Sequence, residues 1–212
     1  MIRLYLSFTG NLPDPAFAPE LLKYLPKRRA DDVLRIMPEE GRKQRLGAGL
    51  LLTKVLKEHG AAPEEVYYDT GGKPRHEKVK FSLSHSGELV ALALSDSGEV
   101  GCDVEKIREV PENVIRIFSE KEQAALNELT DERKKHFFRL WTMRESYLKM
   151  TGEGLSGMGK IALSEDGIFR GGKLVSCFIR NYDVDGYSVS VCGEEDCFDP
   201  FARIVSLVNF FC

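Results

Sequence analysis

Hydrophobic and polar positions in the first part of the chain predict one strand and one long helix. Residues 2–8 alternate as a strand does, and three prolines between positions 13 and 19 mark an irregular passage. A basic helical stretch is expected around residues 20–36. Over residues 39–59 the leucines and Val55 recur with a helical period and Gly60 gives a stop, so this helix is expected to pack on a sheet.

Three short apolar segments follow a Gly-Gly turn and predict strands. They are residues 78–84, 89–95 and 99–105, and their short connectors favour an antiparallel meander. The middle one, LVALALS, is apolar at successive positions, as expected of a strand that is covered on both faces.

The second part of the chain begins with two predicted helices. Ser119 and Glu122 have the spacing of a capping box, which predicts a short helix over residues 120–129. A longer helix is expected over about residues 131–151, where Gly152 and a second glycine predict its end.

Strands are expected again after the second long helix. The segments are residues 160–163, 174–182 and 186–192, with a tight Asp-Gly turn before the last one. Each half of the chain therefore has a long helix followed by antiparallel strands, which predicts an α+β fold and hints at duplication. A linker-like stretch around Pro111 separates the halves.

Composition and charge restrict the class of protein. The chain has 212 residues, of which 42% are hydrophobic and 30% charged, as in an ordinary globular protein. A net charge of −3 argues against a protein that coats nucleic acid. The first residues do not resemble a signal peptide and no apolar run has membrane-spanning length, so we expect a cytoplasmic protein that binds no membrane.

Five cysteines form an odd and scattered set, which favours reduced thiols. Cys192 and Cys197 are too loosely spaced for half of a zinc site, and no second half follows them.

Two acids in the segment EVGCDVE lie on one face of a predicted strand. Asp103 and Glu105 are two residues apart, so their Cα atoms are expected about 6.6 Å apart, close enough for both carboxylates to reach one hard cation. Gly101 leaves room on the same face. The alternative is a sheet edge that carries two solvated acids.

The long second helix aligns an acid and a base with the only tryptophan of the chain. Trp141, Glu145 and Lys149 follow one another at i, i+4 spacing and share a face. A surface Glu–Lys pair of this kind contributes only about 0.3–0.5 kcal/mol. The indole indicates that the face is at least partly covered, which favours a functional role for the pair.

The segment FSLSHSGELVALAL ends one strand and begins the next. Ser84, His85 and the turn amides that follow suit a phosphate, although a satisfied polar histidine is the ordinary alternative. Neighbours on a strand point to opposite faces, so this serine and histidine make a poor nucleophile and base pair. Upstream, Lys73 and Pro74 lie on a glycine turn that matches no nucleotide-binding fingerprint.

Four motifs in this order resemble those of the 4′-phosphopantetheinyl transferases, in particular the monomeric surfactin-synthetase-activating type. They are GKP at 72–74, FSLSHSG at 81–87, VGCDVEKI at 100–107 and FFRLWTMRESYLKMTGEGL at 137–155. The resemblance implies magnesium-dependent transfer of the phosphopantetheine group of coenzyme A to a serine of an apo carrier protein, which leaves adenosine 3′,5′-bisphosphate.

The resemblance also implies a domain organisation. The expected fold is two similar α+β halves related by a pseudo-twofold axis, residues 1–107 and 108–212, with the active site in the cleft between them. Two halves in one chain predict a monomer. Whether the carrier serves fatty-acid, polyketide or peptide assembly is left open.

The resemblance assigns roles in catalysis and metal binding. It places Asp103, Glu105 and Glu145 around Mg²⁺, and three convergent carboxylates would repel one another without a cation. Glu145 is the candidate base for the incoming serine, and Lys149 is placed to stabilise or protonate the departing bisphosphate.

Coenzyme A contacts follow from the same resemblance. Ser84 and His85 match a phosphate-binding pair with His85 near the 3′-phosphate, and Lys73 with Pro74 matches an adenine-side contact. The other expected contacts are Arg28, Asp103, Arg144 and Lys149.

Some positions depart from the pattern of the family. Arg144 stands where many relatives have lysine, and Asp31 where a second basic residue can occur. Arg42, Lys43 or Arg45 are the candidates to compensate as phosphate contacts.

Carrier proteins are typically acidic, so the carrier is expected on a basic or apolar surface beside the cleft. We place this surface after Pro111, near Ile115, Ile117 and Phe118; the alternative is that these residues only pack the next helix. The rival functions are a noncatalytic module that binds coenzyme A or carrier protein, and a magnesium phosphohydrolase.

Overall fold

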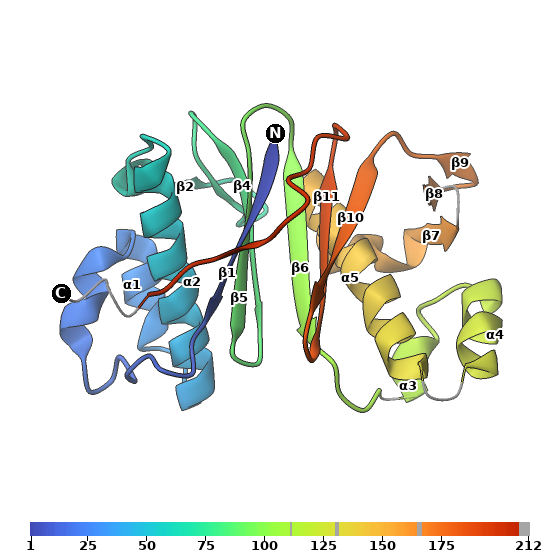
Figure 1. Cartoon of the computed structure of the whole chain (residues 1–212), viewed down its shortest axis with the longest axis horizontal. Helices are drawn as coiled ribbons and strands as arrows, with labels where there is room; N and C mark the ends of the chain where they lie inside the picture. The colour runs from blue at the N-terminus through green and yellow to red at the C-terminus, as the bar shows by residue number, and fades with distance from the viewer. Residues whose placement is uncertain (111, 130–131, 165–166, 208–212) are drawn as a thin grey trace.

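Two small sheets lie side by side between two long helices in the computed structural model (Figure 1). The structure describes residues 1–110, 112–129, 132–164 and 167–207. The predicted linker residue Pro111 and Cys212 fall outside the described residues. Among those described, no helix is both long and apolar enough to cross a bilayer.

The N-terminal sheet has the strand order β12-β1-β5-β4. Its strands are β1 (Ile2–Phe8), β4 (Lys80–Ser86), β5 (Leu89–Ser95) and the short β12 (Arg203–Ile204). Pairing is antiparallel except that β12 runs parallel to β1. Helix α2 (Glu39–Glu58) covers this sheet with its stripe of buried leucines and Val55.

The C-terminal sheet has the order β10-β11-β6 and is antiparallel throughout. Its strands are β6 (Val100–Lys106), β10 (Phe178–Val184) and β11 (Tyr187–Gly193), and helix α5 (Arg133–Thr151) packs against β6 and β11. Both sheets are therefore built in one order along the chain: a strand, a long helix, and a hairpin whose second strand pairs with the first strand.

Shorter elements complete the two halves. In the first half they are η1 (Pro19–Tyr24), α1 (Lys27–Val33), η2 (Pro63–Glu65), β2 (Tyr67–Tyr68) and β3 (Pro74–Arg75). In the second half they are α3 (Glu112–Ile115), α4 (Glu120–Glu128), η3 (Leu155–Lys160), β7 (Ile161–Ser164), β8 (Gly167–Arg170) and β9 (Lys173–Leu174). The last three strands form a small sheet of their own.

Strand β5 is buried on both faces, which accounts for the unbroken apolar run in its sequence. All seven of its residues are buried. Val90, Leu92 and Leu94 belong to the cluster under α2, whereas Leu89 and Ala91 belong to the cluster between the two sheets. The prediction that this strand is covered on both faces is confirmed.

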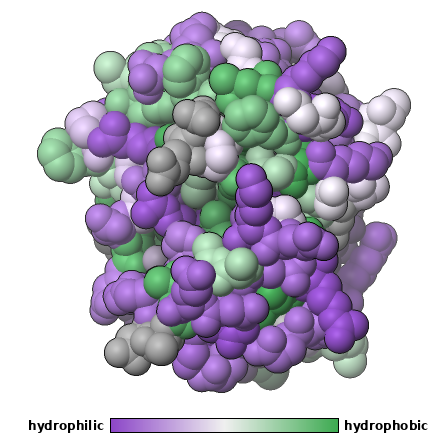
Figure 2. Space-filling model, turned by 90° about the vertical axis from the view of Figure 1, so that its right-hand side faces the viewer, coloured by the Kyte–Doolittle hydropathy of each residue, from purple (hydrophilic) through white to green (hydrophobic). Residues whose placement is uncertain are grey.

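The outer surface of the C-terminal half is mostly hydrophilic in its lower part, at the height of α3 and α4 (Figure 2). Hydrophobic atoms gather in the upper part of the same view, at the height of the β7–β9 sheet. Leu174 of β9 and Phe178 of β10 are large apolar side chains that remain exposed.

Helix ends follow the sequence signals closely. Ser119 caps α4, and the reciprocal bond from Glu122 completes the capping box, as predicted. Helix α5 ends at Gly152, which has a φ of 79°, a left-handed conformation that glycine adopts at little cost. The helix expected over residues 20–36 is instead η1 and α1, separated at Pro26, because proline lacks the amide proton that a continuous helix needs.

One prediction about connectivity is wrong. Strands β4, β5 and β6 do not form one meander, because β6 does not pair with β5 and pairs with β11 instead. Strand β6, which precedes the predicted boundary after residue 107, lies in the C-terminal sheet, and β12 returns to pair with β1. The boundary itself stays a prediction.

Within the C-terminal half, β6 packs closely against α5 because Gly101 has no side chain. A Cβ atom at this position would overlap the carbonyl oxygen of Ser146 and the amide nitrogen of Met150, both part of the backbone of α5. The room that the sequence predicted beside Gly101 is thus filled by the helix that carries Glu145 and Lys149.

We predict that Gly101→Ala destabilises the protein by at least about 3 kcal/mol, because the added methyl group meets backbone that cannot move aside. Gly159→Ala is the matched control, since a Cβ at that position meets nothing within 4 Å, and its free energy of unfolding should change by no more than about 0.5 kcal/mol. Urea denaturation measures both. Equal stability of the two variants would contradict the close packing of β6 on α5.

Candidate active site

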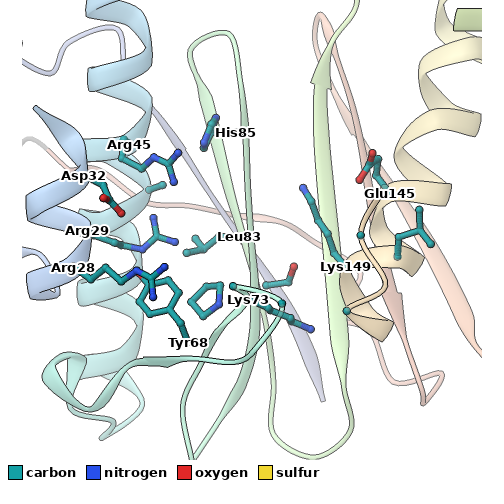
Figure 3. A pocket seen from close by; sticks show the side chains of 18 residues that line it. Arg28, Arg29, Asp32, Arg45, Tyr68, Lys73, Leu83, His85, Glu145 and Lys149 are labelled. Atoms are coloured by element: carbon teal, nitrogen blue, oxygen red, sulfur yellow. The ribbon is translucent and has the colours of Figure 1, made fainter. Parts of the chain in front are cut away.

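A cavity of about 410 Å³ lies between the two halves (Figure 3). The N-terminal half contributes residues of α1, α2, the β2–β3 turn and β4, and the C-terminal half contributes residues of α5. A second hollow of about 320 Å³ shares Leu83, His85, Glu145 and Lys149 with it and adds Ser84, Asp103, Glu105 and Trp141. Most of the residues predicted from separate motifs therefore line one continuous region.

One side of the cavity carries an excess of guanidinium groups. Arg28 lies over the ring of Tyr68 at 4.1 Å, and Arg29 and Arg45 point into the cavity from α1 and α2. The Nε atoms of Arg29 and Arg45 are buried and have no hydrogen-bond partner among the described residues. Burial lowers the pKa of Arg29, and the charge of Arg45 lowers it further. Charged donors without partners are costly, so this side is built for an anion.

The structure separates the three candidates for phosphate binding on α2. Arg42 forms an ion pair with Asp14, and Lys43 is 2.8 Å from Glu39 one turn earlier on the helix. Of these three candidates, only Arg45 lines the cavity. Arg29 was not predicted, although it lies in a run of three basic residues that begins α1, where the helical turn buries one of them.

The neighbouring acids Asp31 and Asp32 differ in whether they line the cavity. Asp31, which departs from the pattern of the family, is exposed and does not line the cavity, whereas Asp32 does. Sequence reasoning did not single out Asp32 or Tyr68.

His85 is half-buried beside the same cations. Its pKa is lowered from 6.5 to about 4, first by burial and then by the charges of Arg45, Lys149 and Arg29. The imidazole is therefore neutral at pH 7 in the ligand-free protein. A phosphate bound near these cations would offset their charge and favour the protonated ring.

Lys149 is hydrogen-bonded across the junction of the two halves. Its Nζ donates to Asp103 Oδ1 at 2.6 Å and to Ser84 Oγ at 2.8 Å, which joins α5 to β6 and β4. Burial works to lower the pKa of Lys149, but the charge of Asp103 and their hydrogen bond outweigh it, so this pKa is raised. Lys149 is thus a fixed positive charge at the centre of the site.

The hydroxyl of Ser84 has no capacity left for a phosphate in this arrangement. It donates to Asp103 Oδ1 at 2.8 Å and accepts from Lys149 Nζ and from the amide of Val104. A hydroxyl has one donor and two acceptor positions, and all three are used.

The carboxyl group of Glu145 has a strongly raised pKa. Its pKa is raised from 4.5 to about 7, first by burial and then by the charges of Asp103 and Glu105, with partial relief from Lys149. The structure thus brings the three predicted metal-binding acids near enough for their charges to interact.

The site contains carboxylate oxygens that could bind a hard cation, but they are not already arranged as a complete set of ligands. Asp103 Oδ2 is buried and has no hydrogen-bond partner among the described residues. In the described part of the chain, no group of three or more His, Cys, Asp or Glu side chains is arranged closely enough to hold a metal ion as it stands. An unpaired carboxylate oxygen and mutual repulsion nevertheless fit Mg²⁺, which is bound by few protein oxygens together with water and phosphate.

Lys73 and Pro74 line the cavity from the β2–β3 turn. The ammonium group of Lys73 donates to the carbonyl oxygens of Val100 at 3.3 Å and Met150 at 3.2 Å, and to Glu99. Its side chain therefore binds the turn to β6 and to the end of α5.

Arg144 does not line the cavity, although a contact with coenzyme A was expected for it. Its side chain is fully buried, pairs at 2.5 Å with both oxygens of Glu122, and lies over the ring of Phe118. Glu122 also accepts from the amide of Leu163. The ion pair fixes α4 and β7 against α5; removal of one partner from such a buried pair typically costs about 3–5 kcal/mol.

The surface expected to meet the carrier protein is also mostly internal. Ile115 and Phe118 are 6% and 3% exposed and pack with Phe137 and Phe138, which is the alternative that the sequence left open. Only Ile117, at 39%, is exposed.

We predict that Glu145→Gln raises the stability of the metal-free protein at pH 8 by about 1–3 kcal/mol and has little effect at pH 4.5. In the native chain the folded pKa of about 7 lies above the ordinary 4.5, so the stabilisation by the protonated carboxyl is complete below pH 4.5 and is lost as the pH rises through 7. Urea denaturation in a chelator at both pH values measures the difference. A gain of the same size at both would contradict the raised pKa.

A family profile and several known proteins that resemble this chain all point to one family. The profile of the ACPS 4′-phosphopantetheinyl transferase superfamily matches residues 99–192. The 4′-phosphopantetheinyl transferase psf-1 of Bacillus pumilus is 31% identical over 198 residues, which cover 86% of this chain and 84% of that protein. The 4′-phosphopantetheinyl transferase Sfp of Bacillus subtilis (strain 168) is 29% identical over 182 residues, 79% of this chain and 81% of the relative.

A protein from another bacterium matches a shorter part of the chain. The 4′-phosphopantetheinyl transferase AcpT of Escherichia coli O157:H7 is 38% identical over 125 residues, 54% of this chain and 61% of that protein. Together with the extent of the match to the Bacillus pumilus protein, these similarities show that the chain belongs to the 4′-phosphopantetheinyl transferase superfamily.

Proposed function

We propose that this 4′-phosphopantetheinyl transferase binds coenzyme A in the cavity between its halves and transfers the phosphopantetheine group to a serine of an apo carrier protein. The observation that carries the proposal is the division of charge in the cavity. Arg29 and Arg45, each with a buried Nε that has no partner among the described residues, lie on the N-terminal side, and Lys149 with Glu145 lies on the C-terminal side. Coenzyme A carries phosphate at two separate places, which suits a cavity with cations at both ends.

The 3′-phosphate is assigned to the side formed by Arg29, Arg45 and His85. Both arginines have a buried Nε without a partner among the residues described, and a phosphate would supply the missing acceptors. The adenine is assigned to the neighbouring wall at Tyr68 and Pro74, which lies next to these cations in the same cavity. The diphosphate then extends to Lys149.

Transfer is a displacement at the phosphorus atom that bears the pantetheine. A bond forms between this phosphorus and the hydroxyl oxygen of the carrier serine, and the bond to the bridging oxygen breaks, which releases adenosine 3′,5′-bisphosphate. Glu145 takes the proton of the serine hydroxyl, and a pKa of about 7 suits a general base at neutral pH. Lys149 stabilises the negative charge that develops on the departing oxygen.

Magnesium is the proposed metal, with Asp103, Glu105 and Glu145 as its protein ligands. When bound, Mg²⁺ supplies positive charge that neutralises the diphosphate as its bond breaks. The unpaired Oδ2 of Asp103 and the raised pKa of Glu145 both support a cation at these acids. Lys149 partly fills this role without metal, since it binds the other oxygen of Asp103.

We also propose that the halves are related by duplication and a pseudo-twofold axis, and that the chain acts as a monomer. Support comes from the equal order of elements in the sheets β1-β5-β4 and β6-β11-β10, each with one long helix. On this reading the division lies before β6, near residues 96–99, instead of after residue 107. One chain then supplies both sides of the cavity.

The direct test is to incubate the protein with coenzyme A, Mg²⁺ and an apo carrier protein, and to weigh the carrier by mass spectrometry. We expect the wild-type protein to add the phosphopantetheine mass. Glu145→Gln keeps the shape of the side chain but not its charge, and should slow the transfer about 100-fold or more.

The same experiment separates the rival functions. A noncatalytic module would bind coenzyme A without changing the mass of the carrier. A phosphohydrolase would release phosphopantetheine when no carrier is present. Near-normal transfer by Glu145→Gln would contradict the role proposed for this carboxylate.

A further inference from the structure

Three serines alternate on β4 and join it to β6. The amides of Cys102, Val104 and Lys106 donate to the hydroxyl oxygens of Ser82, Ser84 and Ser86 at 3.0, 3.3 and 3.1 Å. Each bond is two residues beyond the one before on both strands, so β4 and β6 run in the same direction. Side-chain hydroxyls thus stand here in place of the backbone carbonyls of an ordinary strand pair.

Two of these serines also donate to the acids of β6. The hydroxyl of Ser84 donates to Asp103 Oδ1 and that of Ser86 donates to Glu105 Oε2, both at 2.8 Å. Ser82 lies at the same place in the pattern, but the corresponding residue of β6 is Gly101, which has no side chain to receive a bond.

Both acids are bound through one oxygen only. Asp103 Oδ1 accepts from Ser84 and Lys149, whereas its Oδ2 is buried without a partner in the described structure. Glu105 Oε2 accepts from Ser86 and from Arg108, and no hydrogen bond to its Oε1 is present among the described residues. Each carboxylate is therefore oriented by one oxygen while the other is left for a further ligand.

We propose that Ser86 is a positioning residue of the transferase: its hydroxyl fixes the orientation of Glu105, as Ser84 fixes Asp103, so that the second oxygen of each acid faces a bound Mg²⁺. This inference rests on the proposed function. Glutamate has three rotatable side-chain bonds, and ordering them costs free energy when a metal binds. Ser86 reduces that cost in advance, in the manner of hydrogen-bonded partners that orient metal ligands.

The other contact of Glu105 is a weaker restraint. Arg108 lies 3.1 Å from Oε2, but its side chain is 59% exposed, and ion pairs at such exposure contribute little. Ser86 is half-buried and is also fixed by the amide of Lys106. The serine thus has the geometry to orient the carboxylate, and the arginine mainly adds charge.

The test is the affinity for Mn²⁺ in the presence of coenzyme A and without carrier protein, measured from the free-ion signal in electron paramagnetic resonance. We expect Ser86→Ala to weaken Mn²⁺ binding about tenfold. Ser86→Thr keeps the hydroxyl and should restore most of the affinity. Ser82→Ala is the matched control, because it removes a bond to β6 but no bond to an acid. Ser82 also lines the proposed coenzyme A cavity, so all variants are compared at saturating coenzyme A, where the Mn²⁺ affinity of Ser82→Ala should equal that of the wild type.

The possible failures are distinguishable. Wild-type affinity in Ser86→Ala, or an equal loss in Ser82→Ala, would overturn the positioning role and leave the transferase proposal intact. If the wild-type protein binds no Mn²⁺, the metal site fails together with the inference. Thermal unfolding of all variants shows whether each one is folded under the conditions of the titration.

Discussion

The hydrogen-bonded ion pair between Lys149 and Asp103 is the interaction on which the geometry of the site depends. It joins the last turns of α5 to the middle of β6, and Ser84 extends it to β4. Asp103 is buried and Lys149 is partly buried, so the carboxylate needs its partners in place, because an isolated buried charge is costly. The positions of the two sheets and of the long helix are therefore coupled at the point where coenzyme A is proposed to react.

Close packing makes that interaction possible. Helix α5 approaches β6 through the missing side chain of Gly101, and β4 approaches β6 through short serine side chains. The same nearness brings Glu145 under the influence of Asp103 and Glu105 and raises its pKa. The repulsion that suits these acids to a cation is thus a direct result of how closely α5 packs on β6. Stability in the absence of metal is reduced for the same reason.

Local patterns predicted most of the fold, and contacts between distant residues account for the errors. The apolar run of β5, the capping box at Ser119 and the glycine after α5 each have a physical cause that acts within a few residues. The pairing of β6 with β11 does not, because it depends on a strand 87 residues further along the chain, from Val100 to Tyr187. The ion pair of Arg144 is another contact of this kind, because its partner Glu122 lies 22 residues away and also completes the capping box of α4.

One coenzyme A molecule is proposed to bridge both halves, with its 3′-phosphate at Arg45 and its diphosphate at Lys149. Calorimetric titration of coenzyme A and of 3′-dephospho-coenzyme A tests it most directly. The wild-type protein should bind coenzyme A roughly tenfold or more tightly than the dephospho form, as expected for a charged hydrogen bond, and Arg45→Ala should lose most of that preference. Equal weakening of both ligands in Arg45→Ala, or no preference in the wild type, would contradict the account.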